Sequence, residues 1–367
     1  MNDCIHKNAC RICGQPDFIK ILDLGEMPPA NAYLKKEELD APEEKFPLIV
    51  YFCNNCGLLQ LLDVVSPLVL FRNYHYLTSA SKPLADHFEK MARELADTFV
   101  TSKEDLILEI GGNDGTLLSA VRDTCRVLNV EPAENVAEIS RQRGVPAISD
   151  SFGFNQKFAE GILKDYGRAK VVVANNVVAH IDNLKDMFEG VKMLIGRDGV
   201  FVFEVHWVGN LIGDGGFDQI YHEHLSYFSL TALDYLINQL GLKIFDVKLV
   251  PIHGESLRVY VSANREQEKS VDEFLAREKE LGLDRLESYE NFAKKVEKNK
   301  RDLKDMLIRI KAEGKKIIGY GAPAKGNTLL NYFGIGSDIL EFITDTTSFK
   351  QGLYSPGMRV PIHHPDK

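Results

Sequence analysis

The fold is decided by one stretch of the chain, Leu106-Ile107-Leu108-Glu109-Ile110-Gly111-Gly112-Asn113-Asp114-Gly115-Thr116. Its first five residues have the apolar character of a buried strand, and a loop with three glycines follows directly. Glycine suits such a loop because a backbone that turns sharply and approaches a ligand closely leaves no room for a Cβ. The stretch predicts the first strand of an α/β domain with a cofactor loop at its end, although glycine loops after a strand serve many nucleotide-binding folds.

The same pattern continues on the carboxyl side of this loop. Buried-strand runs recur at Arg126–Val130, Val171–Ala174 and Val200–Val205, with intervals long enough for crossover helices. This alternation predicts a doubly wound parallel sheet. Two further runs, Leu242–Val250 and Leu257–Val261, are joined by a loop too short for a parallel crossover, so they predict an antiparallel hairpin.

Two later strand ends bring polar side chains to the same edge of the predicted sheet. Glu131 follows the strand Arg126–Val130 about 20 residues after the glycine loop begins, where an acid commonly binds ribose hydroxyls. Asn176 follows the next strand, and this segment continues to His180. The glycine loop and Glu131, at the first two strand ends, are features that an NAD-dependent oxidoreductase acting on a nucleotide sugar would share. That function stays open as an alternative. The expected cofactor ligands in the loop and at the end of the second strand are Gly111, Asn113, Asp114, Gly115 and Glu131.

Two C-x-x-C pairs, Cys10/Cys13 and Cys53/Cys56, lie near the N-terminus. In a reducing compartment this spacing indicates a metal rather than disulfides. Four thiolates are the set that tetrahedral zinc prefers, and a closed four-sulfur shell leaves no position for water. We therefore expect a structural zinc that stabilises residues 1–70, which have too little apolar sequence for a core of their own. The alternatives are four unrelated cysteines, or a non-catalytic zinc-stabilised scaffold that binds a partner.

The composition argues against nucleic-acid and membrane partners. Among 367 residues, 44 Lys and Arg stand against 53 Asp and Glu, a net charge of −9, so no long-range field attracts phosphates or an anionic membrane. The N-terminal residues have no apolar stretch of signal-peptide length, and no later segment approaches a membrane span. We expect a cytoplasmic protein whose oligomeric state the sequence does not specify.

The densest group of titratable and aromatic side chains lies between Asp218 and Leu230. Within it, His222, Glu223 and His224 form an H-E-H sequence flanked by tyrosines. A metal site is one alternative, but H-x-H supplies only two ligands and the helical H-E-x-x-H spacing is absent. Packing of the two histidines as structural residues of a strand is another.

Several motifs together resemble the S-adenosylmethionine-dependent sugar C-methyltransferases of branched deoxysugar pathways. The loop at 111–116 is similar to motif I of class I methyltransferases, and the segment from Asn176 to His180 is similar to one whose Asn lies under the methionine portion of the cofactor. The resemblance spans nearly the whole chain in order. Its further motifs are Cys10–Gly14, Gly25–Asn31, Asp218–Leu230 and His253–Arg258.

The resemblance implies methyl transfer to carbon 3 of a nucleotide-linked 4-keto-deoxysugar. A carbon beside a ketone becomes nucleophilic only after losing a proton, so the enzyme needs a base and a group that stabilises the enolate. The resemblance implies His224 as the base, with Glu223 orienting or tuning it. It implies that Tyr221, Tyr76 and His180 line the pocket, and we expect His222 to be structural.

Three residues are expected to hold the nucleotide sugar. Arg258 could bind a diphosphate through its planar guanidinium, and Ser256 could add a hydrogen bond. This chain has Glu255 where the family usually has a glycine, which departs from the pattern of that loop. Lys325 lies in a second glycine-rich turn, Gly319–Asn327, where a phosphate could meet a helix N-terminus.

The resemblance implies a class I methyltransferase Rossmann-like sheet between a small N-terminal zinc-binding domain and a C-terminal Rossmann-like α/β unit. The last unit has fewer strands than a complete α/β domain, so it is either a half-domain that leans on the rest or a domain cut short. The expected parts are a zinc-binding domain at 1–70, an S-adenosylmethionine-binding domain at 71–264, a helical connector at 265–315 and the C-terminal unit at 316–367.

Overall fold

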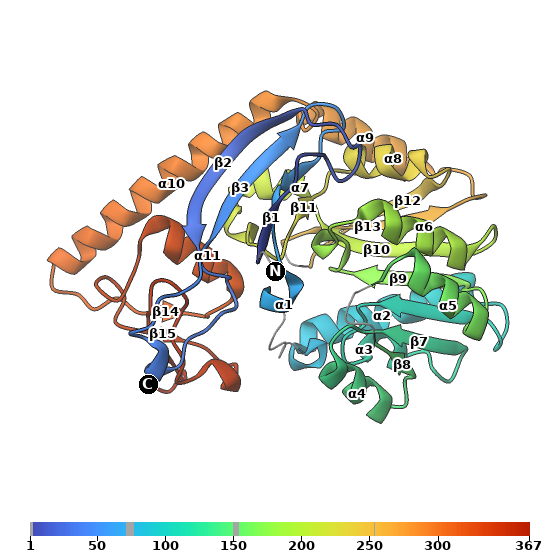
Figure 1. The fold of residues 1–367 in the computed structure, drawn as a ribbon, viewed down its shortest axis with the longest axis horizontal. Coiled ribbons are helices and arrows are strands. Elements are labelled where there is room, and N and C mark those ends of the chain that lie inside the picture. The colour runs from blue at the N-terminus through green and yellow to red at the C-terminus, as the bar shows by residue number, and fades with distance from the viewer. Residues whose placement is uncertain (1–2, 71–76, 150–153, 253) are drawn as a thin grey trace.

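The central sheet contains seven strands in the order β12-β13-β10-β9-β6-β7-β8 (Figure 1). The computed structural model describes residues 3–70, 77–149, 154–252 and 254–367. From β10 to β8 all neighbours are parallel, whereas β13 is antiparallel to both β10 and β12. The predicted parallel sheet and its antiparallel edge hairpin are confirmed. The strands are β6 (Leu106–Ile110), β7 (Arg126–Val130), β8 (Ala147–Ile148), β9 (Val171–Asn175), β10 (Val200–His206), β12 (Lys243–Val250) and β13 (Ser256–Ser262).

Helices cover both faces of this sheet, which explains why its inner strands are apolar throughout. Ile107 and Val173 pack towards α2 on one face, while Leu108 and Val172 pack towards α5 and α6 on the other. Alternate residues of each strand thus belong to two separate cores. The helices around the sheet are α2 (Lys82–Phe99), α3 (Thr116–Ser119), α4 (Glu134–Gln142), α5 (Gln156–Tyr166), α6 (Leu184–Ile195), α7 (Val208–Asp214), α8 (Leu230–Gln239) and α9 (Lys269–Glu280).

The N-terminal segment forms a four-stranded antiparallel sheet in the order β11-β4-β3-β2. Its edge strand β11 comes from far along the chain, directly after the H-E-H segment. The N-terminal segment is therefore joined by backbone hydrogen bonds to the part of the chain that carries His224. The strands are β2 (Phe18–Met27), β3 (Phe46–Cys53), β4 (Leu59–Leu61) and β11 (Ser226–Tyr227), and a separate pair is β1 (Cys4–His6) with β5 (Asp63–Val65).

The C-terminal part begins with a long helix, α10, which lies along β2 (Figure 1). A three-stranded parallel sheet follows in the order β14-β15-β16, with α11 after β14. The apolar residues before β15 are not extended, since Gly336 to Leu340 form a turn closed by backbone hydrogen bonds. These elements are α10 (Leu286–Ala312), β14 (Gly319–Tyr320), α11 (Ala324–Phe333), β15 (Ile343–Thr344) and β16 (Ile362–His363).

The C-terminal unit packs directly on the segment that follows β2. The Tyr33 hydroxyl donates to the carbonyl of Ala322 at 2.6 Å, and Asn327 Nδ2 donates to the carbonyl of Ala30 at 2.7 Å. The second glycine-rich turn therefore lies beside a loop of the N-terminal segment.

The remaining short helices are α1 (Pro67–Leu70), η1 (Lys36–Glu38), η2 (Thr78–Ala80), η3 (Val178–His180), η4 (Phe217–Gln219) and η5 (Ser348–Lys350).

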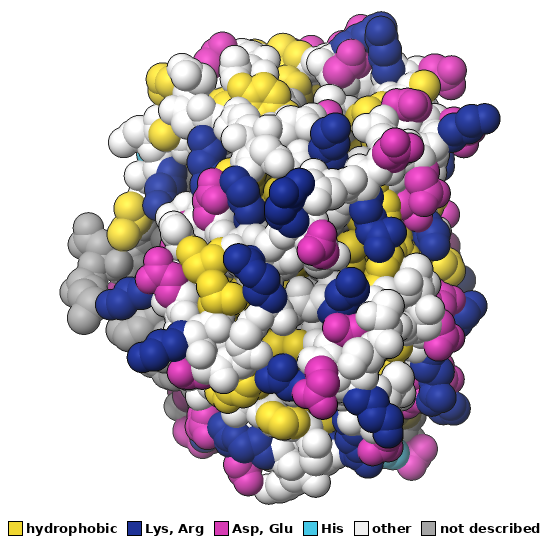
Figure 2. All heavy atoms as spheres, turned by 90° about the vertical axis from the view of Figure 1, so that its right-hand side faces the viewer, with side chains coloured by type: hydrophobic (Ala, Val, Ile, Leu, Met, Phe, Trp, Pro, Cys, Tyr) yellow, Lys and Arg dark blue, Asp and Glu magenta, His cyan; other side chains and the backbone are white. Residues whose placement is uncertain are grey.

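The surface carries both signs of charge. Figure 2 shows the face on the right of Figure 1, where Lys and Arg side chains are interspersed with Asp and Glu. That face therefore offers no broad cationic area of the kind that nucleic acid requires. In the part of the chain that the structure describes, no helix combines the length and the apolar character needed to cross a bilayer.

Candidate active site and metal centre

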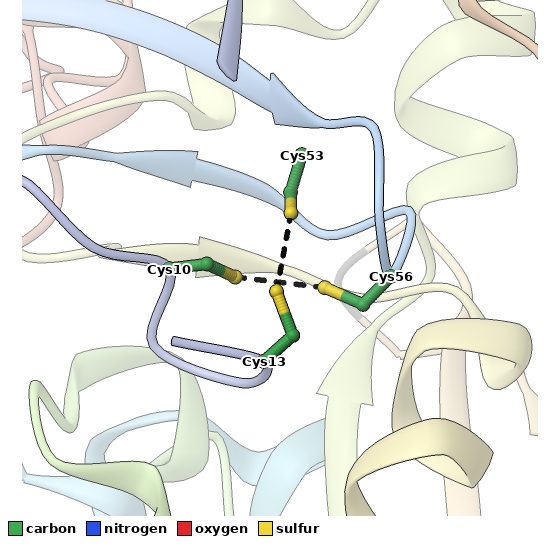
Figure 3. Close-up of side chains that lie close together, drawn as sticks. All are labelled: Cys10, Cys13, Cys53 and Cys56. Atoms are coloured by element: carbon green, nitrogen blue, oxygen red, sulfur yellow. Dashed lines mark hydrogen bonds between the residues drawn. The ribbon is translucent and has the colours of Figure 1, made fainter. Parts of the chain in front are cut away.

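The four cysteines of the two C-x-x-C pairs converge at one point (Figure 3). Their sulfur atoms all lie within 4.8 Å of one another, and the Sγ atoms are 3.5 Å apart both for Cys10 and Cys56 and for Cys13 and Cys53. Zinc bonded tetrahedrally to four sulfurs at about 2.3 Å requires sulfur–sulfur separations of roughly 3.8 Å. The side chains therefore fit a Cys₄ zinc site and confirm the expected ligand cluster.

Two matching backbone turns present these sulfurs. Gly14 and Gly57 each follow the second cysteine of a pair, and their φ angles are +74° and +73°. Their amides donate to the carbonyls of Cys10 and Cys53, both at 2.9 Å. A Cβ on either glycine would meet nothing within 4 Å, so it is the left-handed backbone that favours glycine here.

The glycine loop after β6 needs its glycines for space. A Cβ on Gly111, which has φ +65°, would lie 2.4 Å from Cγ2 of Val177. A Cβ on Gly112 would lie 2.5 Å from Oδ1 of Asn129 and 2.8 Å from Oε2 of Glu109. The loop therefore runs in close contact with the ends of β6, β7 and β9.

The expected cofactor residues of the first two strand ends form one hydrogen-bonded group. Glu131 accepts from the backbone amides of Asn113 at 3.0 Å and Ala133 at 2.9 Å. The Asn113 and Asp114 side chains accept from the amides of Thr78 and Ser79, at 2.9 Å and 3.2 Å. The segment that precedes α2 is therefore fastened to the loop. Burial raises the pKa of Glu131 although these amide donors oppose the shift.

Buried polar atoms without hydrogen-bond partners mark the same edge of the sheet. Among the described residues, Oδ1 of Asn176 and Oε2 of Glu109 have no such partner. Burial raises the pKa of Glu109 to about 8, and the nearby carboxyls of Glu131 and Asp114 add to the shift. Unsatisfied buried groups are rare in native proteins, so this edge fits a site that a polar ligand completes. Sequence reasoning treated Glu109 only as part of a strand.

The H-E-H segment places His224 in a defined tautomer. Its Nδ1 lies 2.9 Å from the carbonyl of Gln219, an acceptor only, so Nδ1 carries the proton. Burial holds the pKa of His224 well below 6.5, so the ring is neutral, and Nε2 is then an acceptor that receives the hydroxyl of Tyr221 at 2.8 Å. His224 is therefore held as a neutral imidazole whose lone pair is on Nε2.

Three imidazoles meet at this point. The ring of His180, from η3, lies 5.0 Å from that of His224 with the planes perpendicular, and the ring of His206, from the end of β10, lies 5.3 Å away. Burial lowers the pKa of His180 to about 4, and burial and the two neighbouring imidazoles hold that of His224 well below 6.5. Sequence reasoning missed His206 because it directly follows the apolar run Val200–Val205; its place at a strand end beside Asn176 was the available signal.

Glu223 and His222 have different partners from His224. Glu223 accepts from Nδ2 of Asn31 at 2.7 Å, and burial raises the pKa of its carboxyl to about 7. In this structure the groups that orient His224 are Gln219 and Tyr221, whereas Glu223 connects the segment to the N-terminal part. His222 bonds the carbonyl of Phe46 at 3.1 Å on the other side. The only metal-type cluster among the described residues is the cysteine site, so the H-E-H sequence forms none with the other residues that the structure describes.

The three residues expected to hold the nucleotide sugar lie in different surroundings. Lys325, in the first turn of α11, lowers the pKa of His224 through its charge and is thus within electrostatic range of the imidazole. Ser256 is fully buried and donates to the carbonyl of Ile252 at 3.1 Å. Tyr76 and His253 lie outside the described residues.

Arg258 requires a correction. Its buried guanidinium bonds Glu204 at 2.7 Å and Glu94 at 3.1 Å, and it lies 3.3 Å from Nε2 of His87. Two carboxylates already compensate its charge, so it is an internal ion-pair residue and not an available diphosphate ligand. The sequence alone could not show this, because these partners come from α2 and β10.

Comparisons with known proteins agree with this architecture. Three family models match consecutive parts of the chain: a zinc binding domain at 10–71, a methyltransferase domain at 84–247 and a C-methyltransferase C-terminal domain at 251–367. The C-methyltransferase NovU of Streptomyces niveus is 35% identical over 364 residues, which cover 98% of this chain and 86% of that protein.

Two solved structures of methyltransferases are more distant. One, in complex with the Trm112 activator of Haloferax volcanii, has a TM-score of 0.40 at 12% identity and covers 51% of this chain and 95% of its own. The other, from Thermotoga maritima, has a TM-score of 0.37 at 14% identity, with coverages of 49% and 92%. These scores are too low to contribute to the assignment.

The methyltransferase domain model favours the S-adenosylmethionine reading of the glycine loop over an NAD-dependent oxidoreductase, and the relationship to an enzyme argues against a non-catalytic scaffold. The chain belongs to the C-methyltransferase family, and it is an S-adenosylmethionine-dependent enzyme of the class I methyltransferase fold with a zinc-binding N-terminal domain.

Proposed function

We propose that the protein methylates carbon 3 of a nucleotide-linked 4-keto-deoxysugar, with His224 as the base that forms the enolate. The observation that carries the proposal is the neutral imidazole whose Nε2 lone pair faces the Tyr221 hydroxyl at 2.8 Å, beside the loop that follows β9. An unprotonated imidazole can accept the acidic hydrogen next to a ketone. The sugar itself is inferred from the sequence motifs described above.

The surrounding residues suit the charge that develops on the substrate. When a proton leaves carbon 3, negative charge moves to the ketone oxygen, and hydrogen-bond donors aimed at that oxygen lower the barrier. We assign two donors to it. One is the His180 imidazole, and the other is the Tyr221 hydroxyl, whose hydrogen turns from Nε2 of His224 to the ketone oxygen when the substrate binds and so frees the lone pair of the base. Bound S-adenosylmethionine supplies the electrophilic methyl group. His224 then holds the abstracted proton until it passes to water.

The remaining assignments follow from the same edge of the sheet. We assign the cofactor to Gly111, Asn113, Asp114, Gly115, Glu131 and Asn176, with Glu131 on the ribose. Glu131 keeps acceptor capacity beyond its two amide bonds, because each carboxylate oxygen accepts more than one hydrogen. Tyr76, Ser256 and Lys325 stay assigned to the sugar nucleotide, with Lys325 on a phosphate.

The direct test is product analysis with a panel of 4-keto sugar nucleotides and S-adenosylmethionine. The proposal expects a new methyl group on carbon 3, identified by NMR through its carbon–carbon coupling when the methyl is ¹³C-labelled. A methyl group on oxygen, nitrogen or another carbon, or no methylation of any member of the panel, would refute the assigned substrate.

Replacing Gly111 by alanine is expected to weaken cofactor binding. The new Cβ would lie 2.4 Å from Val177 at a backbone with φ +65°. The left-handed conformation alone costs about 1–2 kcal/mol in a non-glycine residue, so affinity for S-adenosylhomocysteine should fall roughly tenfold or more by isothermal titration. Gly161→Ala is the matched control, because that helical glycine of α5 has open space around it. Equal affinities of both variants would contradict the loop assignment.

The acid limb of kcat/KM is expected to lie below pH 6.5. Burial and its neighbours hold the pKa of His224 well below 6.5, so the base stays unprotonated as the pH falls through 6.5. In the wild-type enzyme, protonation of Glu223, whose pKa burial raises to about 7, adds a separate limb near pH 7. The Glu223→Gln variant lacks that limb, so the acid limb of its pH profile reports the protonation of His224 alone. A limb at or above pH 6.5 that persists in Glu223→Gln would contradict the assignment.

A further inference from the structure

Arg11 lies inside the zinc-binding sequence, between Cys10 and Cys13, yet its side chain points into the protein. Only 2% of that side chain is exposed. A charged group is seldom buried to this degree unless specific partners hold it. The identity of those partners indicates what the residue does.

One set of partners ties Arg11 to the metal centre. Its backbone amide and its Nη1 both donate to Oε1 of Gln60, at 3.3 Å and 3.2 Å, and Nη1 also donates to the carbonyl of Leu61. Gln60 in turn donates through Nε2 to Sγ of Cys10 at 3.2 Å. Arg11 is thus linked through Gln60 to one of the four sulfurs.

The other partner, Asp182, lies two residues after His180 of the reaction site. Arg11 Nε donates to Oδ1 of Asp182 at 3.2 Å. Lys7 also pairs with Asp182, at 2.6 Å, but 40% of the Lys7 side chain is exposed. The buried contact to the segment that carries His180 and Asp182 therefore comes from the zinc-binding sequence.

Strand β4, whose Leu61 carbonyl accepts from Arg11, is hydrogen-bonded to the segment that carries His224. Leu61 of β4 donates its amide to the carbonyl of Leu225, the residue after His224, at 3.0 Å. Leu225 then donates its amide to the carbonyl of Ala179, the residue before His180, at 2.8 Å. The Arg11 guanidinium is thus connected to both segments that carry these histidines. It reaches the segment of His180 directly through Asp182 and the segment of His224 indirectly through β4.

The contacts of Arg11 are poorly suited to stabilising the fold. Its one carboxylate partner is 32% exposed at the side chain, and Nη2 is buried without a hydrogen-bond partner among the described residues. A buried ion pair of this kind contributes little net stability and is retained in some proteins because it fixes one arrangement.

We propose that Arg11 is a positioning residue that couples the zinc-binding turn to the arms carrying His180 and His224. This inference rests on the proposed function in one respect, the role of His224 as the base. An error of about 1 Å in the position of a reacting group can lower a rate by about 10²-fold, so the coupling has a measurable consequence.

The test uses Arg11→Lys, which keeps the charge and loses the planar fork, and Asp182→Asn, which leaves the zinc-binding turn intact. Both variants are expected to lower kcat roughly 10-fold to 100-fold while zinc content stays at about one ion per chain and the Kd for S-adenosylhomocysteine changes less than about twofold. The double variant should be no slower than the slower single one. Lys7→Met is the matched control and should keep wild-type kcat.

A spectroscopic readout separates positioning from general damage. ¹H–¹⁵N spectra of the histidine imidazoles should show altered His180 and His224 signals in Arg11→Lys and Asp182→Asn and unaltered ones in Lys7→Met. The proposal would be overturned if kcat and the imidazole signals were unchanged in both variants. It would also be overturned if the losses of kcat added up in the double variant, or if kcat fell in proportion to the loss of zinc. If His224→Asn keeps full turnover while the imidazole signals still move, the base assignment fails and the coupling stands.

Discussion

Replacing His224 by asparagine is expected to lower turnover by about 10²–10⁴-fold, the usual range for loss of a general base, without weakening S-adenosylhomocysteine binding. The asparagine amide can still donate to the Gln219 carbonyl, which His224 Nδ1 meets at 2.9 Å, but it offers no basic nitrogen to the substrate. Stopped assays of methyl transfer and isothermal titration of the same preparation measure both quantities. Thermal melting confirms that the variant is folded.

The neighbouring histidine supplies the contrast. His222 is 1% exposed and bonds the carbonyl of Phe46 at 3.1 Å, away from the imidazole cluster. His222→Gln should therefore lower the melting temperature and leave the turnover of the folded fraction near wild type. Equal losses of turnover in the two variants, or lost cofactor affinity in His224→Asn, would count against the assignment of the base.

Replacing Cys53 by serine is expected to remove zinc and, with it, most of the catalytic activity. Structural zinc sites contribute on the order of 10–16 kcal/mol of binding free energy to the folds that contain them. The sequence suggested a metal that stabilises only residues 1–70, but β11 is the edge strand of the N-terminal sheet and begins two residues after His224. Loss of the metal should therefore disturb the position of the base.

Metal analysis, melting and turnover together test this expectation. Cys53→Ser should show zinc well below one ion per chain, a lower melting temperature and reduced kcat. Cys4→Ser is the control, because Cys4 is a free cysteine outside the metal cluster. This variant should keep the zinc content, melting temperature and kcat of the wild type. A zinc-free Cys53→Ser protein with wild-type melting and turnover would show that neither the fold nor the site depends on the metal.

The sequence was sufficient where a feature is local. The predicted strands Leu106–Ile110 and Arg126–Val130 have those same bounds in the structure, because each is an apolar run between turn-forming residues. The cysteine cluster was likewise predictable, since two C-x-x-C pairs in turns have few other uses in a reducing compartment. The glycines of the loop after β6 were expected to allow close approach to a ligand, whereas the structure shows that Gly111 and Gly112 also have no room for a Cβ beside Val177, Asn129 and Glu109.

Features that depend on tertiary pairing were not predictable. β11 has only two residues, too few for a periodic pattern, so its membership of the N-terminal sheet left no signal in the sequence. Arg258 has the chemistry of a phosphate ligand, and only the folded chain reveals its two carboxylate partners. His206 follows an apolar strand run, and its proximity to His224 arises from the order of strands in the sheet.

The claim at the centre of this account is that His224 removes a hydrogen from carbon 3 before the methyl group moves. It is tested most directly by following that hydrogen by NMR in D₂O, with a 4-keto sugar nucleotide, the enzyme and S-adenosylhomocysteine in place of the methyl donor. The account predicts deuterium at carbon 3 faster than without enzyme, and exchange at the background rate with His224→Asn. Exchange by His224→Asn at the wild-type rate, or no catalysed exchange by a wild-type enzyme that methylates the same sugar, would contradict it.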